Sequence, residues 1–379
     1  MKRTLIALAA VATTSAFAQG AAAPQVTLYG VLDAGVTTVN KTCIASAGSA
    51  AADGCAANTR SAGITAVTGG NVASPLFGMR GSEDLGGGLR AVFNLEADVD
   101  PTNGNFDAVT GGGVNASGGT VGSLFRRAAW VGLSGDWGTL TTGRRLNSFI
   151  ANLLGSQVLA SNSVAVSTSA AGGFADFWVK NAVTYSTPNL NGFAAEAMYA
   201  FNNTPGIGSA GTLTSLGVSY TNGPLAVFGG YQDHKASTST VAATTVGHNS
   251  NSVAVKYTLG DWQFAAGVIK TEFDATATLK AYKRDTRQVS MSYAVNKQLT
   301  AGLTYTEVED ARMNSLQARY SLSPRSSLYF MANFNQQGTR TDPNNARVAI
   351  PLAWGARALA PAVAGLSQQA MAVGVIHRF

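Results

Sequence analysis

The chain of 379 residues has little charge, histidine or cysteine. Charged residues make up 12% of it, about half the share found in an average soluble domain. The formal net charge is +6 and basic residues never cluster beyond two or three, so we expect no nucleic-acid partner. The three histidines stand far apart in the sequence, and none accompanies a recognisable serine or cysteine nucleophile. We therefore expect neither an enzyme nor a cofactor.

Metal-binding patterns are also missing. Cys43 and Cys55 share one Gly/Ala/Ser-rich stretch without the histidines that a zinc site would need, and in an oxidising compartment we expect them to form a disulfide. Residues 98–105 are rich in Asp and Asn, as a calcium loop is. Gly104 comes one place late, however, and Val109 stands where that loop requires a bidentate glutamate. We expect no metal site.

No stretch approaches the 18 or more apolar residues of a membrane-spanning helix. Residues 1–18 have a basic start, a short apolar run and a small-x-small ending, which together predict an export signal cleaved before Gln19. A membrane anchor is the alternative, but the apolar run is too short for it. If the mature chain, 19–379, crosses a membrane, it must do so with strands.

Alternating polarity is what the chain has in abundance. Segments of about ten residues with one apolar and one polar face recur along it, which is the length of a membrane-spanning strand. Leu89, Phe93 and Leu95, for example, alternate with residues that include Asn94 and Glu96. Aromatic residues near segment ends are typical of the girdles of a membrane barrel: Tyr29, Trp130, Trp137, Tyr185, Tyr199, Tyr220, Tyr257 and Trp262.

The connections between segments alternate between short and long. The seven short turns are 83–87, 134–136, 188–192, 222–224, 260–261, 296–298 and 323–325. The eight longer stretches are 40–73, 101–122, 146–175, 202–210, 232–249, 274–285, 309–312 and 336–367. A soluble sandwich would not sort its loops by side in this way, whereas an outer-membrane barrel does. The pattern predicts an all-β, sixteen-stranded antiparallel transmembrane barrel with short periplasmic turns and long external loops.

The last strand ends on an aromatic residue with an apolar outer face: Met371, Val373, Val375, His377 and Phe379. We expect Phe379 and His377 to serve as the assembly signal of that strand.

Together with the signal sequence, four motifs resemble the general trimeric porins of Gram-negative bacteria, particularly the beta-proteobacterial type. These motifs are VTLYG at 26–30, RGSEDLGGGL at 80–89, WVGLSGDWGTL at 130–140 and the terminal His377-Arg378-Phe379. The resemblance spans the mature chain. It implies a homotrimer in the outer membrane that passes small hydrophilic solutes and inorganic ions by diffusion.

The resemblance also implies a pore constriction. In such porins the third loop folds into the barrel, and the matching segment here is 146–175. Three arginines from the second, fourth and sixth strands face that loop in the family, and the matching positions here are Leu76, Arg127 and Trp178. Two of the three arginines are therefore replaced.

The segment 146–175 contains no Asp, Glu, Lys or Arg, and Asp176 is the nearest acidic residue. We expect Arg127, with Arg145 and Lys180, to face this uncharged loop and to give a weak preference for anions. An apolar slide for one less polar solute is an alternative, because Leu76 and Trp178 stand where arginines are usual. A third hypothesis is an adhesive or structural barrel with a closed lumen.

Overall fold

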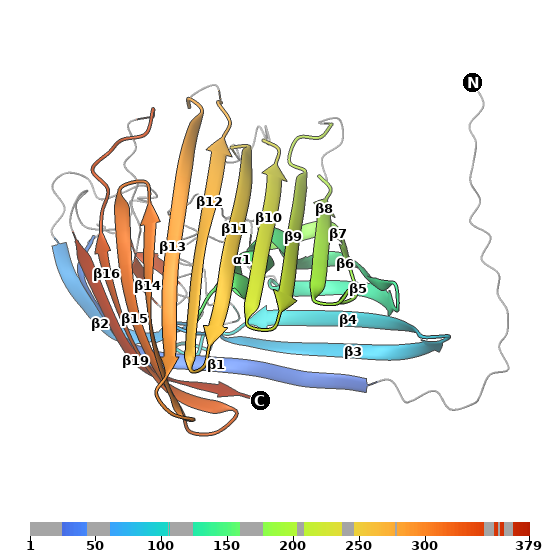
Figure 1. Ribbon diagram of the computed structural model, residues 1–379, viewed down its shortest axis with the longest axis horizontal. Coiled ribbons are helices and arrows are strands. Elements are labelled where there is room, and N and C mark those ends of the chain that lie inside the picture. Colours follow the sequence, from blue (N-terminus) through green and yellow to red (C-terminus); the bar gives the residue numbers. More distant parts are fainter. Residues whose placement is uncertain are drawn as a thin grey trace.

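The computed structural model describes residues 25–43, 61–104, 106, 124–159, 177–202, 208–236, 246–276, 279–344, 352–354, 357–359 and 367–379. It is an antiparallel β-barrel (Figure 1). The strands of the barrel are β1 (Gln25–Cys43), β2 (Ser61–Gly69), β3 (Leu76–Gly86), β4 (Leu89–Asp98), β5 (Ala128–Gly135), β6 (Gly138–Leu146), β7 (Trp178–Ser186), β8 (Phe193–Ala200), β9 (Leu213–Asn222), β10 (Leu225–His234), β11 (His248–Leu259), β12 (Trp262–Phe273), β13 (Tyr282–Ala294), β14 (Leu299–Val308), β15 (Ala311–Ser321), β16 (Ser326–Gln336) and β19 (Gln368–Arg378). A separate hairpin joins β17 (Leu352–Trp354) and β18 (Arg357–Leu359).

The ring closes between the two ends of the chain. One edge of β1 pairs with β19, and its other edge pairs first with β3 and then with β2. Since β2 and β3 follow each other along a single edge, they share one position, and the closed barrel has sixteen positions, as the sequence predicts. Phe379 exchanges two backbone hydrogen bonds with Gly30, each of 3.1 Å. The terminal residue thus takes part in the closure, at the end of the barrel that carries the short turns (Figure 1).

The two faces of each strand meet different surroundings. The outward side chains are exposed and apolar, as the predicted outer face of β19 illustrates with Val373 at 60% exposure. The inward positions are rich in Ser, Thr, Asn and Gln; Ser250, Thr271, Thr306 and Gln317 are examples. An apolar outer band around a polar interior is the arrangement of an outer-membrane barrel. In the described part of the chain, no helix is long and apolar enough to cross a bilayer.

The seven predicted short turns are all present at one end of the barrel. Two connections at the other end differ from expectation. Residues 309–312 were expected as a loop, but β14 and β15 are joined through Glu309 and Asp310 alone, with Glu309 at a φ of 55°. The stretch 40–73 was expected to be loop throughout, yet it contains the end of β1 and the whole of β2. The large apolar residues of β2, Ile64 and Val67, are three positions apart, so they do not show the two-residue period by which a strand is recognised.

Asp310 fastens the chain that follows β16 to this two-residue turn. Its carboxylate accepts hydrogen bonds from the backbone nitrogen of Thr339 at 2.7 Å, from the Thr339 hydroxyl at 2.9 Å and from the backbone nitrogen of Arg340 at 2.9 Å. Partial burial raises the pKa of Asp310, but these hydrogen bonds outweigh it and hold the pKa below its ordinary value.

The interruption between β2 and β3 folds onto the inner wall. The Asp33 carboxylate of β1 accepts hydrogen bonds from the backbone nitrogens of Val72 and Ala73 and from the Tyr329 hydroxyl, at 2.7 to 2.8 Å. Asp33 is fully buried as a result. This lumen-facing carboxylate therefore joins β1, β16 and the segment between β2 and β3.

Candidate functional site

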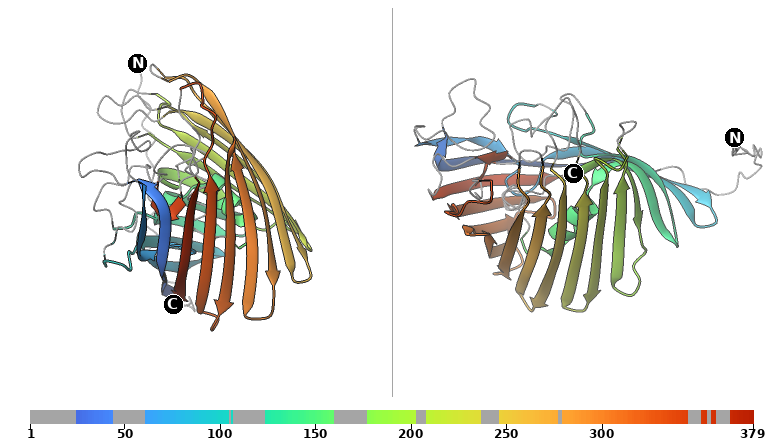
Figure 2. Two further views of the ribbon diagram at one scale, coloured as in Figure 1. Left: turned by 90° about the vertical axis from the view of Figure 1, so that its left-hand side faces the viewer. Right: turned by 90° about the horizontal axis from the view of Figure 1, so that it is seen from above.

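The described part of the third long loop lies against the inner wall of the barrel. Its first residues form α1 (Ser148–Ser156), which packs on β9 and β10 on the concave side of the sheet (Figure 2). Gly217 and Gly230 pair with each other across these strands and both face inward. A Cβ atom at Gly217 would lie 2.7 Å from the Ser148 carbonyl oxygen, and one at Gly230 would lie 2.8 Å from the Phe149 ring. The two glycines therefore form the seat that lets α1 approach the wall.

The first turn of α1 is fixed to the wall by hydrogen bonds. The Asn147 side-chain oxygen accepts from the backbone nitrogen of Phe149 at 2.9 Å and from the Ser215 hydroxyl at 2.5 Å. Its amide nitrogen donates to Gln232 Oε1 at 2.6 Å, and Gln232 Nε2 lies 2.8 Å from His248 Nε2. Since the Gln232 oxygen accepts, its nitrogen donates, and His248 Nε2 is the acceptor. The N-cap of α1 is thus tied to β9, β10 and β11.

Arg127 stands at the centre of a lumen cluster just before β5. Its Nη1 lies 3.1 Å from Asp98 Oδ1 and its Nε lies 3.4 Å from Glu96 Oε2. The same Nη1 donates to the Ser74 hydroxyl at 2.8 Å. The guanidinium carbon lies 4.4 Å from the centre of the Trp178 ring, which is a cation–π distance. The positive charge of Arg127 is therefore opposed locally by two carboxylates.

A second cluster repeats this arrangement one strand further on. Arg145 Nη2 lies 2.7 Å from Glu196 Oε2, and the Arg145 guanidinium carbon lies 5.6 Å from the centre of the Trp130 ring. Glu196 also accepts hydrogen bonds from Ser186 at 2.7 Å and from Ser148, the first residue of α1, at 2.8 Å. Glu196 therefore offsets the charge of Arg145 and fastens the helix to the wall.

Comparison with known proteins agrees with this architecture. A family model described as Gram-negative porin matches residues 4–340. The chain belongs to the Gram-negative porin family. It is 32% identical over 285 residues to outer membrane porin protein 32 of Delftia acidovorans, covering 72% of this chain and 70% of that protein. It is also 32% identical to an outer membrane porin protein of Bordetella pertussis, over 62% of this chain and 60% of the relative.

Solved structures of porins superpose on the whole barrel. The anion-selective porin from Comamonas acidovorans has a TM-score of 0.71 and 25% identity, and the match covers 94% of this chain and all of the other. OmpT of Vibrio cholerae in its trimer form has a TM-score of 0.64 at 17% identity, with 94% and 100% coverage, which shows the shared fold. As a member of this family, the protein is an outer-membrane channel.

The residues that we expected at the constriction of this porin fall into two groups. Four of them lie on the inner face or in the lumen clusters. Leu76 pairs with Val31 and Asp98 on the inner face, and the clusters described above contain Arg127, Arg145 and Trp178. Lys180 is exposed and takes part in neither of the two clusters described above.

The alternation that placed Lys180 inward is interrupted in β7. There Val179 pairs with Arg145 and Ala182 pairs with Gly143, so a bulge lies between them, and Asn181 has a φ of 54°. Asp176, Cys55 and the second half of 146–175 lie outside the described residues, as does the side chain of Cys43, the last residue of β1.

Several residues of the site were not recognised from the sequence. Trp130 and Tyr29 were assigned to the membrane girdles, but both face the lumen: Tyr29 donates to Asn94 and Glu96, and Trp130 lies beneath Arg145. The other six predicted girdle residues are exposed on the outer face. Glu196 gave no signal beyond its inward parity. Gly217 and Gly230 could have been found, because the tight turn at 222–224 sets the register that pairs them.

Proposed function

We propose that this porin assembles as a homotrimer from the mature chain 19–379 and conducts small hydrophilic solutes and inorganic ions passively, with a weak preference for anions. The trimer is supported by OmpT of Vibrio cholerae, one solved structure of which is described as the trimer form. An anion-selective channel is among the solved porins that superpose on the chain. The proposal assigns no catalytic step and no cofactor to the protein.

One observation supports the anion preference in particular. Arg127 and Arg145 are paired with carboxylates, so neither adds much net charge to the lumen. At the carboxyl end of α1, Lys256 of β11 faces inward. Among the described residues no carboxylate lies within 4 Å of its ammonium group. The described part of the third loop carries no charge that could offset it. An uncompensated cation at the narrow level of a channel favours anions.

The test is the reversal potential of single trimers in a planar bilayer across a KCl gradient. We expect current steps in groups of three and a reversal potential of the sign for chloride preference. Lys256→Gln should move that potential towards the ideal value for no selectivity, whereas the matched variant Lys283→Gln, on the outer face of β13, should not. A preference for potassium, or an absence of channels from correctly folded protein, would overturn the proposal.

A further inference from the structure

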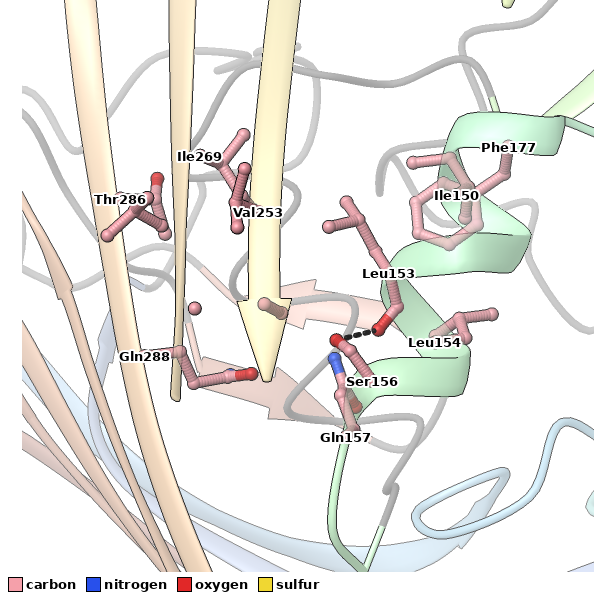
Figure 3. Close-up of a pocket in the computed structure, with 13 residues that line it drawn as sticks. Ile150, Leu153, Leu154, Ser156, Gln157, Phe177, Val253, Ile269, Thr286 and Gln288 are labelled. Carbon is pink, nitrogen blue, oxygen red and sulfur yellow. Dashed lines mark hydrogen bonds between the residues drawn. The ribbon is translucent and has the colours of Figure 1, made fainter. Parts of the chain in front are cut away.

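A groove opens in the lumen beside α1. It runs between α1 and the inner face of β11, β12 and β13, and contains about 510 Å³ of empty space, part of it open to the channel (Figure 3). The helix side is mainly apolar and is made by Ile150, Leu153, Leu154 and, beyond the helix, Phe177. The strand side is made by Ile269, Thr286 and Gln288. An apolar recess of this kind is unusual for a wall otherwise lined by hydroxyl and amide groups.

The floor and the frame of the groove are built from fixed parts. Ala254 and Gly267 pair across β11 and β12 at the floor, and a Cβ atom at Gly267 would lie 2.8 Å from that of Ala254. Because both residues are small, they leave space above the strands at this point of the groove. The helix wall cannot move freely, because Phe149 and Ile150 are buried against the barrel. The groove is therefore a preformed cavity, as small-molecule sites usually are.

A positive charge lies next to the groove. Lys256 faces inward two residues after Ala254, and its Nζ donates to the Gly155 carbonyl oxygen at 2.7 Å. Gly155 directly precedes Ser156 and Gln157, which line the groove. The ammonium group is thus held at the carboxyl end of α1 and beside the apolar recess. The site combines an apolar slot with one cation, and the chemistry that fits both is a small anion with an apolar tail.

We propose that the groove is a binding subsite for small amphiphilic carboxylates, with the tail against Leu153, Leu154 and Phe177 and the carboxylate towards Lys256. The inference rests on the proposed function, since it assigns a solute class to that channel. Transfer of the tail from lumen water into the groove supplies the binding energy. At about 0.8 kcal/mol per buried CH₂, each added methylene tightens binding by up to about fourfold.

The test is solute block of the channel current at constant KCl. Acetate, butyrate and hexanoate are titrated against single trimers, with hexylammonium as the probe of opposite charge. We expect the concentration for half-block to fall by up to about fourfold per methylene, and hexanoate to block more strongly than hexylammonium. Equal block by acetate and hexanoate would overturn the proposal.

Variants separate the groove from general effects on the channel. Leu153→Ser removes apolar surface, and Ala254→Leu fills the floor; both should abolish the dependence on chain length. Ala194→Leu, at an inward position of β8 away from the groove, is the matched control and should retain it. Lys256→Gln should weaken block by every carboxylate while leaving the increment per methylene. A full chain-length dependence in both Leu153→Ser and Ala254→Leu would refute the site. Normal KCl conductance without this dependence refutes the groove alone, whereas the absence of conductance refutes the channel.

Discussion

Arg127 is the residue whose replacement gives the sharpest prediction. Arg127→Met keeps most of the side-chain length but leaves Glu96 and Asp98, whose side chains are 16% and 3% exposed, without their cation. Removing one partner of a buried ion pair costs about 3–5 kcal/mol. We expect the lower end, about 3 kcal/mol, because Glu96 is still reached by lumen water. The measurement is the urea midpoint for unfolding of the purified porin in detergent.

The same variant should change ion selectivity. In the native cluster one guanidinium faces two carboxylates, and in Arg127→Met two carboxylates remain alone. The lumen then carries an additional negative charge at this level, so the reversal potential in a KCl gradient should shift towards potassium. Arg127→Lys should retain most of the selectivity. It should lose part of the stability, because an ammonium group cannot stack on Trp178 as a guanidinium does.

A triple variant separates charge from packing. Arg127→Met combined with Glu96→Gln and Asp98→Asn removes all three charges, and exchanging a whole buried ion cluster for neutral groups is often nearly neutral in free energy. We therefore expect the triple variant to regain most of the lost stability and the chloride preference. If the single and triple variants unfold at the same urea concentration, the loss arises from packing against Trp178, and the electrostatic reasoning is wrong.

Three further predictions concern the helix seat, the outer loops and the start of the chain. Gly217→Val should push α1 towards the lumen axis and lower single-channel conductance, and its overpacking should lower the free energy of unfolding by about 1–3 kcal/mol. The control variant Gly229→Ala, on the outer face of the next strand, should leave conductance unchanged. The depressed pKa of Asp310 means that its contribution is complete above about pH 4 and is lost as pH falls through the folded-state value. The protection factors of the amides after β16, which are corrected for the intrinsic exchange rate, should therefore fall in acid, and Asp310→Asn should have low protection factors already at neutral pH. Mass spectrometry of the exported protein should find Gln19 as its first residue.

The strand faces could be predicted from the sequence because lipid and water impose opposite demands on alternate residues. In β4 the polar residues Asn94 and Glu96 must face water, and alternation then turns the apolar residues of the strand outward. The structure places Leu89, Phe93 and Leu95 on that outer face. The turn residues then predicted which strand ends are connected by short turns. The prediction needed no knowledge of distant contacts, since both signals are local.

The constriction could be predicted only in part, because it depends on contacts between strands that are not sequence neighbours. The bulge at Asn181 interrupts the regular alternation of β7, and no local pattern announces it. The ion pairs of Arg127 and Arg145 are equally invisible, since each carboxylate partner lies dozens of residues away. The resemblance pointed to Arg127, but its carboxylate partners became visible only in the structure.

The distribution of compensated and uncompensated charge sets how strong the selectivity of this porin is. Arg127 and Arg145 are paired with carboxylates and the described third loop is neutral, so Lys256 is the cation that we expect to bias the channel towards anions. A single lumen cation is screened by mobile ions over about 10 Å at 0.1 M salt and about 3 Å at 1 M. The chloride preference should therefore weaken strongly between 0.1 M and 1 M KCl at a fixed gradient ratio. A preference that stays constant over this range would show that pore geometry, and not the Lys256 charge, discriminates between the ions.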